Sequence, residues 1–365
     1  MEQLKSNHNI YTAIIGSGSY IPTRRITNHD FISAEFFDET GKQLSKPNEE
    51  IIEKFGEITG IQERRYVSED LVTSDIAFFA AEDAIASSGI DKETLDYIIV
   101  AHNFGDIKET NRRSEFVPAL ASRVKHQLKI KNSNTICYDL PFGCAGWLQA
   151  FIQSDFYLKS GSAGRILVIG AETLSRISDP HDRDSMIYAD GAGAVIVEGK
   201  ERANPVGILS HCSHTYATDH AYALSMGKSN NPGYPTDNLF LKMQGRSLYE
   251  HALKKVPKVI KESIDKAGLT LKQIHKVLIH QANLKMIEAI LHRLFDEYGL
   301  KKIPENVLPL TIGWLGNSSV ATLPTLYDLF SKDKLQDHKI ESGTNLVFAS
   351  VGAGVNINSV VYRVP

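Results

Sequence analysis

Short runs of β-branched and aliphatic residues alternate along the chain with longer stretches of helical periodicity. Each apolar run is bounded by glycine or polar residues, which predicts a strand buried on both faces. The expected strands lie at 10–16, 97–101, 135–139, 166–170, 194–197, 277–279, 346–349 and 357–362. The expected helices lie at 75–88, 145–159, 248–267, 283–298 and 318–330, and Pro257 should kink or interrupt one of them. This alternation predicts an α/β fold with mostly parallel central sheets.

The same order of elements occurs twice. Residues 84–90 and then 95–100 read as helix, glycine stop, turn and strand, and 263–269 and then 274–279 repeat that order. In each half a further strand, at 135–139 and at 306–310, then leads through a loop into a helix. We expect two duplicated halves, 1–200 and 201–365, joined by a polar hinge at 199–205. The alternative is a chance likeness between two α/β units.

Composition and charge narrow the class of protein. The chain has 365 residues, 42% of them hydrophobic and 23% charged, as in ordinary globular proteins. A net charge of -3 gives no electrostatic footprint for nucleic acid. The first nine residues lack the apolar core of a signal peptide, and no apolar stretch approaches the roughly 18 residues of a membrane span. With only three cysteines, a reducing, cytoplasmic location is expected.

Cys144 is the first candidate for chemistry. It lies in Gly143-Cys144-Ala145-Gly146, between an expected strand and an expected helix. Backbone amides and the helix dipole at such a place lower a thiol pKa and bind an oxyanion, so a nucleophile is expected there. The alternative for a lone cysteine is a small buried hydrophobe. Cys137, inside the preceding strand, is expected in the core.

Two further residues favour the nucleophile. His280 follows an expected strand, and Asn317 lies in a loop before a helix. Reactive groups of open α/β sheets gather at the carboxyl ends of strands, where all three candidates fall. Ala101 occupies the place of His280 in the first half, and His102 comes one residue later and should point elsewhere. Alone, a histidine at a strand end is more often a structural group.

With their spacing, these residues resemble the Cys-His-Asn motifs of the ketoacyl-acyl-carrier-protein synthase III (KAS III) family, which has the thiolase fold. The likeness covers nearly the whole chain, and each motif is weak alone but strong in this order. The motifs are Cys144, residues 280–283 and residues 316–322, supported by residues 14–22, 59–65, 179–183, 190–194 and 352–354.

The resemblance implies two duplicated halves in a layered α/β/α/β/α arrangement and a Claisen condensation of acyl thioesters in lipid or secondary-metabolite synthesis. Cys144 would take the acyl group, with the amides of Cys144 and Gly354 as oxyanion hole. His280 and Asn317 would hold the thioester oxygen of a malonyl-type extender while an enolate forms. It further implies acyl carrier protein or acyl-CoA as partners, a homodimer, and neither cofactor nor metal.

Some positions depart from the family. The family stacks the coenzyme A adenine on a tryptophan and an arginine, and residues 48–58 here contain neither, which favours a carrier-bound or otherwise unusual primer. Arg183 matches the family's arginine, but Asp184 stands where glycine is usual. Basic residues on one face are expected to dock an acidic carrier protein, with a solvated helix face as the alternative. They are Lys285, Lys254, Lys255 and Lys258.

The segment 106–116 looks longer and more charged than its family counterpart near the dimer interface and acyl pocket. Some relatives, including olefin-forming head-to-head condensing enzymes, use an extra glutamate upstream of the cysteine as base. Glu115 or Glu109 is a candidate for that base, with a surface ion pair as the alternative. These features also resemble the branch that condenses two fatty-acid-derived chains toward dialkylresorcinols or cyclohexanediones.

Other interpretations are less favoured or remain rivals. Gly16-Ser17-Gly18 follows a strand, but Ile21 stands where a dinucleotide site needs glycine. A cluster of His211, Cys212, His214 and His220 completes no familiar zinc pattern. Two rival functions use the same fold: an acyltransferase or thioester hydrolase without carbon–carbon bond formation, and a non-catalytic partner subunit.

Overall fold

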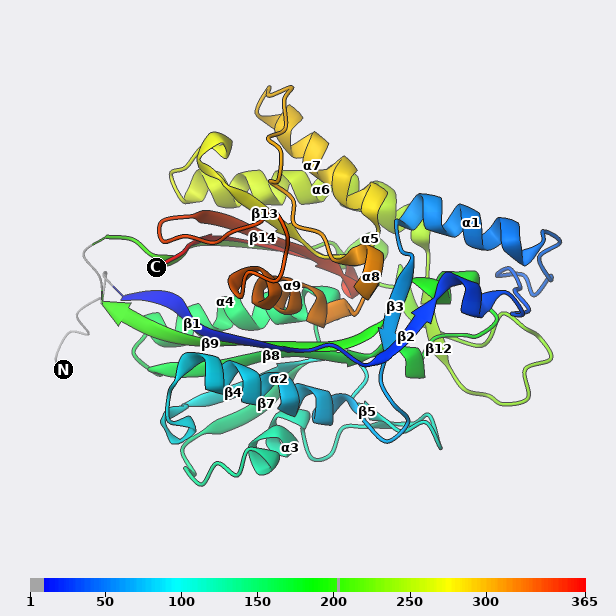
Figure 1. The fold of residues 1–365 in the computed structure, drawn as a ribbon, viewed down its shortest axis with the longest axis horizontal. Helices are drawn as coiled ribbons and strands as arrows, with labels where there is room; N and C mark the ends of the chain where they lie inside the picture. Colours follow the sequence, from blue (N-terminus) through cyan, green and yellow to red (C-terminus); the bar gives the residue numbers. More distant parts are fainter. Residues whose placement is uncertain (1–9, 202–203) are drawn as a thin grey trace.

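The computed structural model describes residues 10–201 and 204–365. In Figure 1, two β-sheets alternate with three layers of helices, so the layers run α, β, α, β, α. One outer layer holds α6 (Gly245–Lys266) and α7 (Leu284–Glu297), the middle layer α4 (Gly146–Lys159) and α9 (Thr322–Ser331), and the other outer layer α2 (Thr73–Ser88) and α3 (Leu120–Gln127). In the described part of the chain, no helix combines the length and apolarity needed to cross a membrane.

The first sheet has the strand order β1-β9-β8-β4-β7. Its strands are β1 (Ile10–Tyr20), β9 (Asp190–Glu201), β8 (Arg165–Thr173), β4 (Tyr97–Ala101) and β7 (Ile136–Leu140). The pairs β8–β4 and β4–β7 are parallel, whereas β1–β9 and β9–β8 are antiparallel. The parallel part of the sheet thus ends at β7, which leads directly to Cys144.

The second sheet has the order β10-β15-β14-β13. Its strands are β10 (Gly207–Thr215), β15 (Asn356–Arg363), β14 (Asn345–Gly352) and β13 (Lys276–Ile279). Only β13–β14 is parallel. The division of the chain at residue 200 stays a prediction, and residues 202–203 of the expected hinge lie outside the described residues.

All eight expected strands and all five expected helices are confirmed as elements, with ends that shift by a few residues. The expected strand at 306–310 is wrong, because no regular strand forms there. Pro309 has no N–H for a ladder, and Asn306 turns the backbone with φ of 58°. One hydrogen bond, from Val277 N to the Val307 carbonyl at 2.8 Å, still ties this segment to β13.

Pro257 does not interrupt α6, which continues from Gly245 to Lys266. A proline inside a helix leaves the carbonyl four residues earlier without its N–H partner. That carbonyl belongs to Leu253, and Arg293 of α7 donates to it at 3.4 Å. The neighbouring helix therefore replaces the bond that the proline removes.

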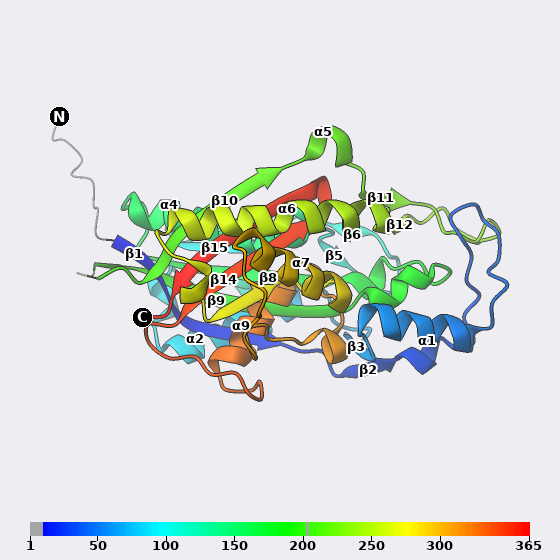
Figure 2. The same ribbon diagram turned by 90° about the horizontal axis from the view of Figure 1, so that it is seen from above.

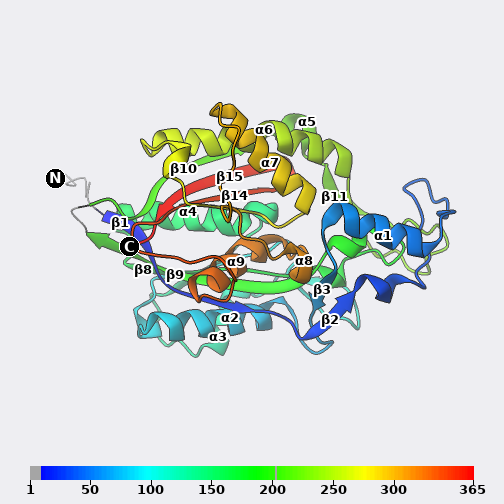
Figure 3. The same ribbon diagram turned by 45° about the horizontal axis from the view of Figure 1, so that its top comes forward.

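The sequence patterns did not predict α1 (Asn48–Thr59) or the hairpin of β11 (Leu224–Gly227) and β12 (Phe240–Met243). Figure 2 shows both at the end of the molecule away from the two termini, and Figure 3 shows the same arrangement obliquely. The remaining helices and strands are β2 (Arg24–Thr27), β3 (Glu63–Tyr66), β5 (Asp106–Ile107), β6 (Ser114–Glu115), α5 (Ala217–His220) and α8 (Ile312–Leu315).

Helix α9 is tied to the first sheet through a buried carboxylate. Asp328 accepts hydrogen bonds from the hydroxyls of Ser17 at 2.8 Å and Ser19 at 2.6 Å, both on β1. Lys332 pairs with the same carboxylate at 2.7 Å. A fully buried carboxylate is tolerated only with such partners, so these contacts fix α9 against the first sheet.

Candidate active site

A cavity of about 570 Å³ lies between α1, the β11–β12 hairpin and the start of α6. Cys144, His280 and Asn317 all line it, so the structure brings together the three residues that the sequence predicted. Its other walls are largely apolar, which suits an acyl chain. They include Ile51, Phe55, Phe104, Leu224, Leu241 and Leu248.

Cys144 lies in a short turn between β7 and α4, and two glycines allow the chain to pass close by. A Cβ on Gly143 would lie 2.4 Å from the amide nitrogen of Ala353, and a Cβ on Gly352 would lie 2.3 Å from that of Cys144. Gly143 also has φ of 61°, which favours glycine. The segment after β14 is thereby held against the backbone of the cysteine.

The sulfur of Cys144 accepts a hydrogen bond from the Ser319 hydroxyl at 3.2 Å. Burial raises the pKa of the Cys144 thiol to about 11; the Ser319 bond acts in the opposite direction, and the negative charge of Glu172 raises it further. The expectation of a lowered thiol pKa is therefore wrong for the free protein. Loss of water around the sulfur penalises the thiolate more than local donors favour it.

His280 directly follows β13, and its backbone N–H bonds to the Ala349 carbonyl at 2.9 Å. Its Nδ1 lies 2.7 Å from the Thr322 hydroxyl, which in turn donates to the Ser319 carbonyl at 3.0 Å. A hydroxyl has one proton, so in this arrangement Nδ1 carries the ring proton and Nε2 is an acceptor. Burial lowers the pKa of His280 to about 4, which keeps the ring neutral at pH 7.

Asn317 is fixed through its backbone and its side-chain oxygen. Its N–H bonds to the Ile187 carbonyl at 3.0 Å, and its carbonyl accepts from Ala189 N at 2.9 Å. Its Oδ1 accepts from Ser319 N at 2.8 Å. This contact fixes the amide orientation and leaves Nδ2 as the donor end of the side chain.

The oxyanion hole was predicted to use the amides of Cys144 and Gly354, and of these two residues only Cys144 lines the cavity. Gly352 and Ala353 line the cavity beside Cys144. Gly354 follows them with φ of 73°, a left-handed conformation that glycine adopts without strain. The role of the Gly354 amide stays a prediction.

Glu172 was not singled out from the sequence. It lies near the end of β8, is 1% exposed, and accepts from Asn103 N at 3.1 Å and Asn103 Nδ2 at 2.8 Å. Burial raises its pKa to about 7. The sequence feature that could have identified Glu172 is its position directly after the apolar run 166–171. A residue there lies at the same sheet edge as the nucleophile.

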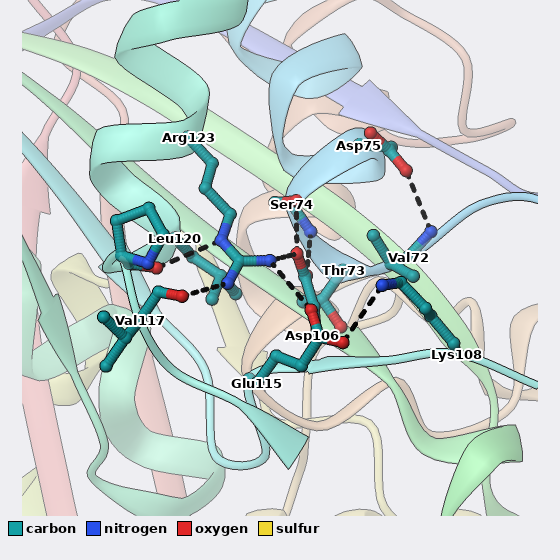
Figure 4. A network of polar contacts seen from close by, with 12 residues as sticks. Val72, Thr73, Ser74, Asp75, Asp106, Lys108, Glu115, Val117, Leu120 and Arg123 are labelled. Atoms are coloured by element: carbon teal, nitrogen blue, oxygen red, sulfur yellow. Dashed lines mark hydrogen bonds and ion pairs between the residues drawn. The ribbon is translucent and has the colours of Figure 1, made fainter. Parts of the chain in front are cut away.

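The candidate base Glu115 is not brought to the cavity of its own chain. Figure 4 shows Glu115 beside Lys108 and Arg123, at 3.0 Å from Lys108 and 3.7 Å from Arg123. These cations lower its pKa. Glu109 likewise pairs with Arg112 and Arg176. Both glutamates match the ion-pair alternative better than the base.

Basic residues are found at the mouth and beyond it. Arg183 lines the cavity 3.6 Å from Asp184, and Lys46 and Lys54 line the same mouth although the sequence did not single them out. The predicted docking lysines do not line the cavity. Lys285, Lys254 and Lys258 are exposed, and Lys255 lies over the ring of Tyr216 at 4.8 Å.

The histidine and cysteine cluster on β10 has partners of its own. His214 pairs with Glu262 at 2.8 Å, and His211 lies 3.8 Å from Asp155. Across residues 10–201 and 204–365, no group of three or more histidine, cysteine or acidic side chains is arranged to hold a metal ion. Contacts with carboxylates therefore account for His214 and His211, and burial lowers the pKa of His211.

The fold and the cavity match known proteins. Residues 138–217 match the family model of 3-oxoacyl-[acyl-carrier-protein] synthase III, and residues 264–364 match the model of its C-terminal part. The synthase III structure from Aquifex aeolicus VF5 is 28% identical with a TM-score of 0.76, covering 96% of this chain and 99% of that one. The synthase III structure from Thermus thermophilus is 29% identical with a TM-score of 0.78, covering 97% of this chain and 99% of that one.

A variant of OleA from Xanthomonas campestris is 15% identical with a TM-score of 0.75, covering 97% of this chain and 98% of that one, and shares the fold alone. The layers and the matches define a condensing enzyme of the thiolase superfamily. Within it, the chain belongs to the 3-oxoacyl-[acyl-carrier-protein] synthase III family. It is an acyltransferase of a family that uses acyl-carrier-protein or acyl-CoA thioesters in Claisen condensation.

Proposed function

We propose that Cys144 accepts the acyl group of the primer and that His280 and Asn317 serve the extender in a carbon–carbon bond-forming condensation. The observation that carries this proposal is that all three side chains line one largely apolar cavity. A cavity with a few convergent polar groups is the usual form of a site for a long apolar substrate.

Acylation starts from a neutral pair. With a thiol pKa near 11 and a histidine pKa near 4, both Cys144 and His280 are uncharged at pH 7. The sulfur attacks the thioester carbonyl while Nε2 of His280 takes the thiol proton. The carbon–sulfur bond to the carrier then breaks, and the leaving thiolate receives that proton from His280. Amides beside Cys144 stabilise the oxyanion between the two steps.

Condensation uses the donors at the other side of the cavity. A malonyl-type extender places its thioester oxygen against Nδ2 of Asn317 and a protonated Nε2 of His280. Loss of carbon dioxide leaves an enolate, which forms the new bond to the acyl carbon. The Cys144 thiolate departs and takes up one proton. The Thr322 hydroxyl can turn to donate to Nδ1, which permits the proton on Nε2.

We propose a carrier-bound primer. The cavity mouth carries Lys46, Lys54 and Arg183 among acidic neighbours, and residues 48–58 contain no tryptophan or arginine to stack an adenine. Lys285 is exposed between Asn283 and Met286, which line the cavity, so an acidic carrier docked there would lie beside the mouth.

Docking is tested by charge reversal. Lys285→Glu should raise the KM for the acyl-carrier substrate about tenfold or more at low salt, with little change for an acyl-CoA of the same chain. Lys272→Glu, an exposed lysine in the turn before β13, is the matched control. Equal effects of the two variants would remove Lys285 from the docking surface.

We further propose a homodimer that works in the cytoplasm, where the three free thiols stay reduced. β7 is an edge strand, and beside it Phe116 and Val117 are exposed. In Figure 4, Arg123 of α3 donates to the Val117 carbonyl at 3.1 Å and to Asp106 at 2.6 Å, which ties this turn to α3. Val117→Arg should shift the sedimentation coefficient toward the monomer, whereas Tyr222→Arg, an exposed control, should not.

The function is tested by intact-protein mass after incubation with acyl thioesters on coenzyme A and on carrier protein, followed by extender and product analysis. An adduct on wild type but not on Cys144→Ala, converted to a longer β-keto product, is expected. His280→Ala should keep some adduct but lose product. Free acid or ester as the sole product would support the acyltransferase or hydrolase instead. The dialkylresorcinol branch stays a prediction that the same product analysis addresses.

A further inference from the structure

Ser319 is a strained residue at the centre of the site. It begins the turn Ser319–Ala321, is 3% exposed, and has φ of 52°. A residue other than glycine rarely adopts this left-handed backbone conformation, and such strain persists only where the surrounding structure enforces it. Ser319 also lines the cavity. The surrounding structure therefore holds the polar atoms of Ser319 in fixed positions.

Each polar group of Ser319 leads to a different member of the proposed catalytic set. Its hydroxyl donates to Cys144 Sγ at 3.2 Å. Its N–H donates to Asn317 Oδ1 at 2.8 Å. Its carbonyl accepts from the Thr322 hydroxyl at 3.0 Å, and that hydroxyl lies 2.7 Å from His280 Nδ1. One residue thus connects the three side chains that come from separate elements.

The direction of the hydroxyl bond follows from the residues behind it. Asn103 Nδ2 donates to the Glu172 carboxylate at 2.8 Å and to Ser319 Oγ at 3.3 Å. The amide nitrogen of Asn103 only donates, and above pH 7 the ionised Glu172 carboxylate only accepts, so this orientation of Asn103 is fixed there. The Ser319 oxygen therefore acts as acceptor toward Asn103, and its single proton is directed to the sulfur of Cys144.

We propose that Ser319 is a positioning residue of the condensing reaction, and that its hydroxyl, oriented by Asn103 and Glu172, stabilises the Cys144 thiolate as it forms. This rests on the proposed role of Cys144 as nucleophile. When the thiol proton leaves for His280, the neutral hydrogen bond from Ser319 becomes a charge-assisted one, which is shorter and stronger. The backbone groups of Ser319 meanwhile hold Asn317 and Thr322 in place.

The test is the pH dependence of Cys144 alkylation by iodoacetamide, followed by mass spectrometry of the labelled peptide. Ser319→Ala removes the hydroxyl but keeps the backbone N–H and carbonyl. We expect its alkylation midpoint to move about one pH unit upward or more, and the rate below the midpoint to fall about tenfold, because only the thiolate reacts. Acylation by the primer should slow by a similar factor.

Ser318→Ala is the matched control. Ser318 is the neighbouring buried serine, and in the described residues its hydroxyl makes no hydrogen bond to the catalytic set. Its alkylation profile should superimpose on that of wild type. A purely structural effect of losing a buried hydroxyl in this turn would move both variants alike, and that result would overturn the proposal.

Asn103→Ala covers the case in which Ser319→Ala does not fold. It removes the amide that orients the hydroxyl, so the midpoint should move in the same direction by a smaller amount. A folded Ser319→Ala, or failing that a folded Asn103→Ala, with the wild-type profile would overturn the role of Ser319. Absence of any acyl adduct on wild-type Cys144 is a different result, because it refutes the proposed function itself.

Discussion

In each of the two sheets, one strand is directly followed by a histidine, and the two histidines have different surroundings. His102 directly follows β4 in the first sheet, and His280 directly follows β13 in the second. Both rings are almost fully buried, at 1% and 2% exposure. Their partners, rather than their burial, distinguish them.

His102 is held from both sides. Its Nδ1 accepts from Gly105 N at 3.1 Å, and its Nε2 lies 3.0 Å from the Asp139 carboxylate, so neither nitrogen is free to react. Among the described residues, the His280 ring hydrogen-bonds only to the neutral hydroxyl of Thr322, through Nδ1, and His280 lines the cavity. A histidine whose second nitrogen meets an open cavity can exchange a proton with a substrate, whereas one that bridges a carboxylate and an amide holds a loop.

The largest expected effect belongs to His280→Ala. Removing the proton acceptor should lower kcat/KM for condensation by about 10²–10⁴-fold while the melting temperature changes little. Because the pKa of His280 is about 4, the acid limb of the wild-type pH profile should lie well below that of an ordinary histidine at 6.5. Steady-state kinetics from pH 4 to 8 checks both points, and an acid limb near 6.5 would contradict the neutral-pair mechanism.

Glu172→Gln should change stability in a pH-dependent way. The folded pKa of Glu172 is about 7 against 4.5 for the free group, so between these values the native state keeps a proton that the unfolded chain loses. The contribution of Glu172 to the free energy of unfolding of the wild type therefore falls as pH rises from 4.5 to 7. The variant should gain up to about 3 kcal/mol over wild type above pH 7 and nothing below 4.5. Urea unfolding at pH 4.5 and 8 measures this, and a pH-independent difference would refute it.

His102→Ala should reverse the pattern of His280→Ala. The change should leave the Gly105 amide without its acceptor and remove one contact of Asp139, which keeps its bonds from Leu120 N and Ala121 N. The free energy of unfolding should fall by about 1–3 kcal/mol. Condensation activity per folded molecule should change less than tenfold. Urea unfolding with kinetics on the same samples checks this, and His126→Ala, on the exposed side of α3, is the control. A catalytic defect as large as that of His280→Ala would end the distinction between the two histidines.

Thr322→Val should give the smallest effect. The variant keeps the shape of the side chain but removes the oxygen that fixes His280 Nδ1, so kcat should fall severalfold, up to about tenfold. Thr322→Ser, which keeps the hydroxyl, should restore most of the activity. Equal rates for the two variants would show that the hydroxyl does not set the state of His280.

The fold was largely predictable because its signals are local. Apolar runs such as 166–170 and 346–349 mark buried strands without reference to the rest of the chain. The segments that were missed depend on distant partners. Helix α1 is rich in charges and buries Ile51, Phe55 and Thr59, so its apolar pattern is weak. Helix α6 was predicted, but its continuity through Pro257 depends on Arg293 of another helix.

The site was predictable in its residues but not in its electrostatics. Cys144, His280 and Asn317 could be found because each follows a strand or precedes a helix. The burial that raises the thiol pKa comes from distant segments packed around the sulfur, which sequence spacing does not reveal. The hydrogen bonds of Ser319 and Glu172 likewise join residues that lie far apart in the chain.

The contact between β1 and α9 has a consequence for how the chain is synthesised. Ser17 and Asp328 are 311 positions apart, so β1 leaves the ribosome roughly 15 to 60 s before its partner helix at ordinary elongation rates. During that interval the inner face of the first sheet has no α9 to cover it. The nascent chain must therefore be kept from aggregating until its last tenth emerges, and a truncation that removes α9 should give an insoluble product rather than a folded first half.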